Sequence, residues 1–129
     1  MTIRIIPERF APHFQGVLRI VAALLFLQHG TAKLFGAPHV AMFDGLKIFS
    51  LLGVGGAIEL VGGLLLLAGL FTRPVAFVLS GEMAVAYFGF HAFDAFWPIL
   101  NKGELAALYC FVFLFFAAAG PGRFALDRE

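Results

Sequence analysis

Residues 17–36 read VLRIVAALLFLQHGTAKLFG, a stretch that decides the fold class because it is long and apolar yet carries ionisable side chains. An apolar segment of about 20 residues can cross a bilayer as a helix. Ionisable groups in such a segment are costly unless they face protein or water, which applies here to Arg19, His29 and Lys33. At about 100° per residue, the three side chains fall within an arc of roughly 80°. We therefore expect a membrane helix with one polar side.

The composition of the whole chain indicates an integral membrane protein. Of its 129 residues, 61% are hydrophobic, 16% aromatic and only 13% charged, whereas soluble domains are about 45–50% apolar. The lipid bilayer is therefore the expected partner. A net charge of +1 without any basic run argues against nucleic acid as a partner. The single cysteine, Cys110, excludes an internal disulfide, a CxxC redox pair and a cysteine-rich zinc site.

Four apolar segments predict an all-α, integral membrane four-helix bundle with short loops, as one transmembrane domain over residues 1–129. Each segment is long enough, or nearly so, to span a bilayer with modest tilt. Backbone groups in hydrocarbon must be hydrogen-bonded within the structure, and no alternating pattern predicts a barrel, so the segments must be helical. The helices are expected at residues 16–35, 51–71, 74–90 and 104–119.

Glu59 is expected to face the interior of the bundle. It shares a helix face with Gly56 and Gly63, small residues that let another backbone approach closely. Counting 1.5 Å per residue along each helix places Glu59 at nearly the depth of His29 and Lys33. A salt bridge between the first two helices is therefore predicted.

The role of these polar groups has two open interpretations. In one, they form a satisfied cluster that only fixes the register of the helices. In the other, His29, Lys33, Glu59 and Glu104 line a small outward-facing cavity that binds a polar headgroup. A metal site formed by His29, Glu59, Glu104 and His91 is disfavoured, because no two of these four residues have a helical ligand spacing such as HxxxH.

Two further ionisable residues also have alternative roles. Arg19 lies about one turn inside its end of the first helix, where its side chain either extends to the headgroups or forms a buried ion pair with Glu82. Glu104 follows Asn101 at the start of the fourth helix, so it either completes a capping box or contributes to the cavity. No residue is identified as catalytic.

Three stretches of the chain match a known pattern: LRIVAALLFLQHGTAKLFG in the first helix, GGAIELVGGLLLLAGLFTRP across the second, and NKGELAALYCFVFLFFAAAGPGRFALD at the end. On these motifs the chain resembles the DoxX family of small bacterial membrane proteins. The resemblance implies a four-helix protein of the bacterial inner membrane. Some relatives are linked to thiosulfate or quinol oxidation as subunits of larger membrane enzymes. In the family's usual ending GPGxxSLD, a serine is common where this chain has Ala125.

The resemblance and the polar helix face leave two classes of function open. The first is a redox-associated subunit or quinone-headgroup-binding membrane module, as a non-catalytic or quinone-binding part of an oxidoreductase complex. A quinone is then the candidate cofactor, and a protein of the complex or a second copy of the chain is the candidate partner. The second is a non-enzymatic membrane protein, either a small-solute or proton pathway or an assembly factor, whose buried charges are structural.

The distribution of basic residues predicts that both termini lie in the cytoplasm. A cysteine introduced near Pro98 should react with an impermeant thiol reagent in intact cells, whereas one near Arg128 should not. The parent chain, whose Cys110 lies in a predicted membrane segment, is the control. The reverse labelling pattern would invert the topology. The prediction rests on six basic residues on the side of the termini against three on the other side, namely Arg4, Arg9, Arg19, Arg73, Arg123 and Arg128 against Lys33, Lys47 and Lys102.

Overall fold

The computed structural model describes residues 1–128, and within them all regular secondary structure is helical. The predicted all-α fold is confirmed. Two stretches of the described chain, Glu8–Phe35 and Leu51–Ala68, are long and apolar enough to cross a membrane by length and composition. The long helices are α1 (Ala11–Phe35), α2 (Leu51–Ala68), α3 (Thr72–Phe90) and α5 (Glu104–Ala119), and the connections contain α4 (Pro98–Asn101) and the 3-10 turns η1 (Glu8–Phe10) and η2 (Ala41–Phe43).

The helix boundaries follow local sequence signals. Helix α1 begins earlier than expected, at Ala11, because a proline is favourable in the first turn of a helix. Helix α2 begins after Ser50, whose Oγ accepts a hydrogen bond from the Gly53 amide at 3.1 Å. It ends three residues before the expected Phe71, because Gly69 adopts the left-handed conformation that terminates helices, with φ of 68°.

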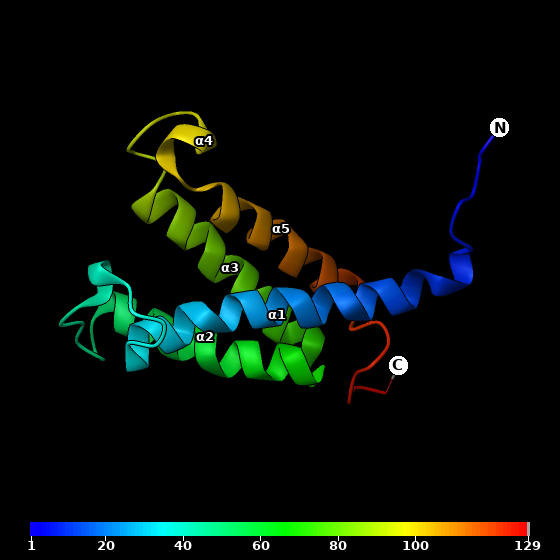
Figure 1. Cartoon of the computed structure of the whole chain (residues 1–129), viewed down its shortest axis with the longest axis horizontal. Helices are drawn as coiled ribbons and strands as arrows, with labels where there is room; N and C mark the ends of the chain where they lie inside the picture. The colour runs from blue at the N-terminus through cyan, green and yellow to red at the C-terminus, as the bar shows by residue number, and fades with distance from the viewer. Residues whose placement is uncertain (129) are drawn as a thin grey trace.

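The long helices form two pairs that diverge from one end of the molecule (Figure 1). Helix α1 packs along α2, helix α3 packs along α5, and α2 also contacts α3. The pairs lie close together near the end that carries both chain termini, which we call the closed end. They separate toward the connections 37–50 and 91–103, which we call the open end.

Glycines allow α1 and α2 to pack backbone against backbone. A Cβ atom added at Gly30 would lie 2.8 Å from the amide nitrogen of Leu60 and 3.0 Å from the carbonyl oxygen of Gly56. A Cβ atom at Gly56 would lie 2.8 Å from Cβ of Lys33. Such close approach is typical of small residues at membrane helix interfaces. It brings Lys33 of α1 against the face of α2 that carries Glu59.

An aromatic core joins the two helix pairs between the closed end and the middle of the molecule. The ring of Phe26 in α1 makes edge contacts with Tyr109 and Phe113 of α5, at centroid distances of 5.5 and 5.0 Å.

Apolar side chains also cover the outside of the helices, where a soluble protein would carry few. The exposed apolar residues include Val21, Leu24, Val61, Leu64, Phe77, Leu108 and Phe111.

Arg19 ties the C-terminal tail, residues 120–128, to the closed end. Its side chain is 0% exposed. Its Nε donates a hydrogen bond to the carbonyl oxygen of Leu66 at 2.9 Å, and its terminal nitrogens donate to the carbonyl oxygens of Pro121, Arg123 and Phe124. Arg19 therefore neither extends to the headgroups nor pairs with Glu82, the two roles that were expected for it. The physical reason is that the returning tail offers carbonyl oxygens within direct reach.

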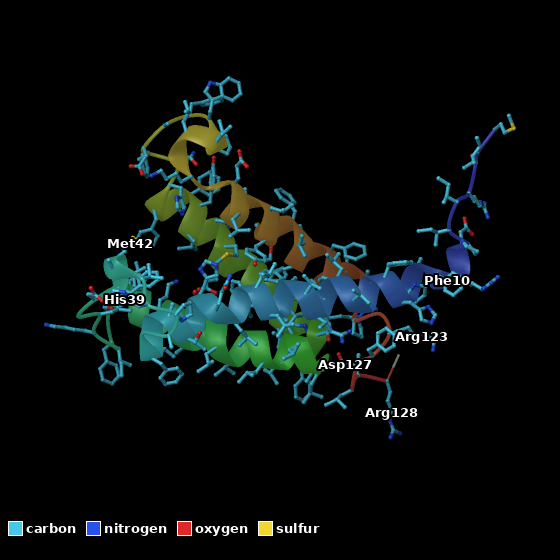
Figure 2. The ribbon with its side chains drawn as sticks, viewed as in Figure 1. Phe10, His39, Met42, Arg123, Asp127 and Arg128 are labelled. Carbon is cyan, nitrogen blue, oxygen red and sulfur yellow. The ribbon has the colours of Figure 1, made fainter. Side chains whose placement is uncertain are left out.

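The tail also caps helix α3 through Asp127, which lies near the closed end while Arg128 points away from the helices (Figure 2). The two carboxylate oxygens of Asp127 accept hydrogen bonds from the amides of Phe71 and Thr72, each at 2.8 Å. A carboxylate at a helix N-terminus is favourable because the first amides have no partners within the helix. Burial acts to raise the pKa of Asp127, but the hydrogen bonds from Thr72 and Phe71 and the charge of Arg19 hold it below its ordinary value.

We predict that Asp127→Ala destabilises the fold by about 1 kcal/mol at neutral pH, the usual cost of losing a helix cap. Because the folded state lowers this pKa, the contribution is present above the ordinary aspartate pKa of about 3.9 and is lost as the pH falls through the folded value. Thermal unfolding in detergent, measured from pH 7 to pH 3, should show the wild type and the variant converging in acid.

The matched control for this experiment is Asp94→Ala. Asp94 is exposed in the connection at the open end, so its removal should leave the midpoint within experimental error at every pH. A constant difference between wild type and Asp127→Ala down to pH 3 would contradict the capping role of the carboxylate.

Candidate functional site

A cavity of about 770 Å³ lies between the two helix pairs at the open end, where Figure 2 marks His39 and Met42. Binding sites for small molecules commonly have volumes of about 300–1,000 Å³. All four long helices contribute to its walls, and the 37–50 connection covers part of it. Most of the lining is apolar, and it includes Phe26, Val54, Ile58, Val78, Val85 and Leu105.

Lys33 and Glu59 form a salt bridge that links α1 to α2 beside the cavity. The ammonium nitrogen of Lys33 lies 2.6 Å from Oε1 and 2.8 Å from Oε2 of Glu59. The Glu59 side chain is 1% exposed and that of Lys33 is 14% exposed. The Lys33 ammonium also lies 5.5 Å from the ring centroid of Phe43 in η2. The predicted interhelical salt bridge is therefore present, and both oxygens of Glu59 accept a hydrogen bond from Lys33.

Glu82 of α3 lies beside this pair, whereas an ion pair with Arg19 was one of the two roles expected for Arg19. Its carboxyl group is close enough to that of Glu59 for a hydrogen bond between them, which requires one of the two carboxyl groups to carry a proton. A Cβ atom at Gly55 would lie 3.3 Å from Oε1 of Glu82. The other oxygen, Oε2, is buried and has no hydrogen-bond partner within residues 1–128. Glycine on α2 thus leaves the room in which the α3 carboxyl group approaches Glu59.

His29 also lines the cavity and completes what we call the polar cluster, namely His29, Lys33, Glu59 and Glu82. Its ring lies 6.4 Å from that of Phe26, between centroids. The imidazole is half-buried and within electrostatic reach of both Glu59 and Lys33. The structure therefore brings together three of the four residues expected in the cavity and adds Glu82. A glycine on α2 facing an acidic residue on α3 is the sequence signal that could have found Glu82.

Glu104, the fourth expected residue, lies outside the cavity. Its side chain is exposed, and α5 begins without a side-chain cap, so the expected capping box is not formed either. Residues 105, 106 and 109 face the cavity, and at about 100° per residue Glu104 falls on the opposite side of the helix. Asn101 is buried and donates hydrogen bonds to the Tyr87 hydroxyl and the Ala95 carbonyl oxygen, each at 3.1 Å.

The site combines a polar cluster with long apolar walls. Across residues 1–128, the structure places no group of three His, Cys, Asp or Glu side chains in an arrangement that would hold a metal ion. The geometry instead fits a molecule that has an apolar body and a polar end, because apolar walls bury the body while a few polar groups orient the end.

Known proteins are similar to this chain over most of its length. The family model described as DoxX matches residues 14–92, a range that includes the entire polar cluster. The chain is 47% identical over 127 residues to an uncharacterized protein of Haemophilus influenzae, with 95% of this chain and 94% of that protein covered. It is 29% identical over 137 residues to an uncharacterized membrane protein of Mycobacterium tuberculosis, with 87% and 78% covered. No solved structure matches the chain significantly.

We predict that Lys33→Met destabilises the protein more than Glu59→Leu does. Removing one partner of a buried ion pair costs about 3–5 kcal/mol, because the other charge is left uncompensated. In Glu59→Leu the nearby Glu82 can still compensate Lys33, whereas in Lys33→Met two neighbouring carboxyl groups lose their only cation in the polar cluster. Thermal unfolding in detergent should therefore rank the midpoints wild type, Glu59→Leu, Lys33→Met in descending order.

The double variant Lys33→Met/Glu59→Leu should recover part of the loss seen in Lys33→Met, since it removes one of the two facing acids. Glu104→Gln, at an exposed position outside the cavity, serves as the control and should unfold like the wild type. Midpoints for Lys33→Met and Glu59→Leu that equal the wild type would contradict a structural role for the salt bridge.

Proposed function

Because the chain belongs to the DoxX family, we propose that this membrane protein binds the headgroup of a quinone-class amphiphile in the cavity between its helix pairs. In this role it is a redox-associated subunit or module rather than a catalyst by itself. The observation that carries the proposal is the cavity of about 770 Å³, with apolar walls and the polar cluster on one side. Redox chemistry would be supplied by the quinone and by the cofactor of a partner protein.

We further propose that all four long helices span a bacterial inner membrane and that both termini are cytoplasmic. Helices α3 and α5 contain 19 and 16 residues, or about 28 and 24 Å at 1.5 Å per residue. The hydrocarbon core is about 30 Å thick, and local thinning accommodates a mismatch of this size at modest cost. The position of both termini at the closed end supports a shared side of the membrane for them (Figure 1).

The packing of the closed end supports ligand binding over conduction through the bundle. The cavity reaches Phe26 and Tyr109. Beyond them, the space between the helix pairs is filled by side chains that are each no more than 1% exposed, namely Leu66, Leu79, Phe113 and Phe116. A site that is open at one end and packed at the other suits a molecule that enters and leaves by the same route.

The proposal predicts that the purified protein carries a quinone. Protein isolated in mild detergent and extracted with organic solvent should yield quinone in near-stoichiometric amount by chromatography and mass spectrometry. Added decyl-benzoquinone should also bind saturably to the extracted protein. Absence of both extractable quinone and saturable binding would contradict the proposed function.

Two glycines of α3 provide a matched pair of variants for this experiment. A Cβ atom meets nothing within 4 Å at either Gly81 or Gly89, so both positions accept a larger side chain. Gly81 lines the cavity and Gly89 does not. Gly81→Phe should therefore weaken decyl-benzoquinone binding by about tenfold or more, a loss of about 1.4 kcal/mol, while Gly89→Phe should bind like the wild type. Equal binding by the two variants would place the ligand elsewhere.

A further inference from the structure

A second hollow, on the outer face of α2 and α3, adjoins the cavity. It has a volume of about 500 Å³ and lies between residues 57–65 of α2 and 74–79 of α3. We call it the α2–α3 groove. Every residue that lines it is apolar or glycine. Ile58 of α2 and Val78 of α3 line both the groove and the cavity, so the two spaces meet at these side chains.

The junction between the groove and the cavity lies at the depth of the polar cluster. Ile58 directly precedes Glu59 in α2, and Val78 lies four residues before Glu82, on the same face of α3. From Ile58 the groove extends to Leu65, about 10 Å toward the closed end at 1.5 Å per residue. A molecule whose headgroup lies beside the polar cluster can therefore extend an apolar chain directly into the groove.

The groove has a closed floor and exposed rims. A Cβ atom at Gly62 would lie 2.7 Å from Cδ2 of Leu79, so α2 and α3 touch at this point. The Leu79 side chain is 1% exposed, whereas Val61 and Val78 are each 57% exposed. Because the hydrocarbon core of a bilayer contains no water, such a groove in a membrane-spanning helix pair is filled by an apolar chain.

Contacts hold the other neighbouring long helices together. A Cβ atom at Gly30 of α1 would lie 2.8 Å from the backbone of α2. The hydroxyl group of Ser80 in α3 donates to the carbonyl oxygen of Cys110 in α5 at 2.7 Å. Phe26 of α1 contacts Tyr109 of α5, with 5.5 Å between ring centroids. The open end leads to the membrane surface, where an apolar chain would meet water, so the α2–α3 groove is the favoured path for it.

We propose that the α2–α3 groove binds the apolar tail of the amphiphile whose headgroup occupies the cavity. The inference rests on the proposed function and assigns the tail a site of its own, on the lipid-facing side of α2 and α3. A helix of a second copy is about 10–12 Å wide with its side chains, so it would cover the groove without extending into the cavity. A phospholipid acyl chain in the groove would be independent of the ligand in the cavity.

The test maps where the tail lies. A decyl-benzoquinone analogue that carries a diazirine at the end of its tail is photoactivated with the full-length protein in nanodiscs, and labelled peptides are identified by mass spectrometry. We expect the label within residues 57–65 and 74–79. Excess unmodified decyl-benzoquinone should largely abolish this labelling, because both molecules compete for the headgroup site.

Two valines provide matched variants for the same experiment. Val61 lines the groove but not the cavity, and Val21 of α1 lines neither. Both side chains are exposed, so phenylalanine fits at either position. Val61→Phe fills the groove and should weaken decyl-benzoquinone binding by about fivefold, or about 1 kcal/mol, and reduce labelling there. Val21→Phe should bind and label like the wild type. Size-exclusion chromatography and circular dichroism check that each variant is folded.

The possible outcomes separate this inference from the proposed function. Saturable decyl-benzoquinone binding with displaceable label outside the groove would overturn the tail site and leave the proposed function intact. Groove label that decyl-benzoquinone does not displace would also overturn it, since the groove would then take lipid independently of the cavity. Equal binding by Val61→Phe and Val21→Phe would count against it in the same way. If decyl-benzoquinone does not bind saturably, the proposed function fails and this inference fails with it.

Discussion

The buried guanidinium group of Arg19 holds the closed end of the molecule together. A buried guanidinium must have hydrogen-bond acceptors for its N–H groups, because an unsatisfied buried charge is very costly. Here the acceptors come from α2 and from the C-terminal tail, at Leu66, Pro121, Arg123 and Phe124. The tail must therefore return beneath α1, and this return brings Asp127 to the start of α3. Three of the long helices are thus fixed at one end by a single side chain and the segment that it binds.

The divergence of the helix pairs follows from where they are joined. The pairs are held by Arg19 and the tail at the closed end and by the aromatic core around Phe26, while beyond this core the cavity separates them. Close packing of α1 on α2 at Gly30 and Gly56 then directs Lys33 and Glu59 to the edge of that cavity. A salt bridge that served only helix register could be replaced by apolar packing without loss of stability. In this protein Glu82 lies beside the salt bridge as well, so the polar cluster contains two carboxyl groups next to one ammonium group.

Three residues lie elsewhere than expected, because residue spacing predicts depth along a helix but not the rotation of one helix relative to another. Depth along a helix made Arg19 and Glu82 compatible as a pair, but depth does not say which side of each helix faces the other. In the structure, Arg19 donates hydrogen bonds to backbone carbonyl oxygens of the tail, and the carboxyl group of Glu82 lies next to that of Glu59. Glu104 was expected either to cap α5 or to line the cavity, but the rotation of α5 turns its side chain away from the cavity and no side-chain cap is formed.

The sequence by itself determined the helical fold, the approximate limits of the four long helices and the salt bridge between Lys33 and Glu59. These properties depend on local composition and on periodicity along neighbouring helices, with small residues marking the close contact. Only the tertiary structure decided the partners of Arg19, the approach of Glu82 to Glu59 and the existence of the cavity. These features depend on the rotation and crossing of helices that are distant in sequence, and on a tail whose carbonyl groups carry no side-chain signal. Backbone acceptors are the same in every residue, so no pattern of residue types could have revealed that they would bind Arg19.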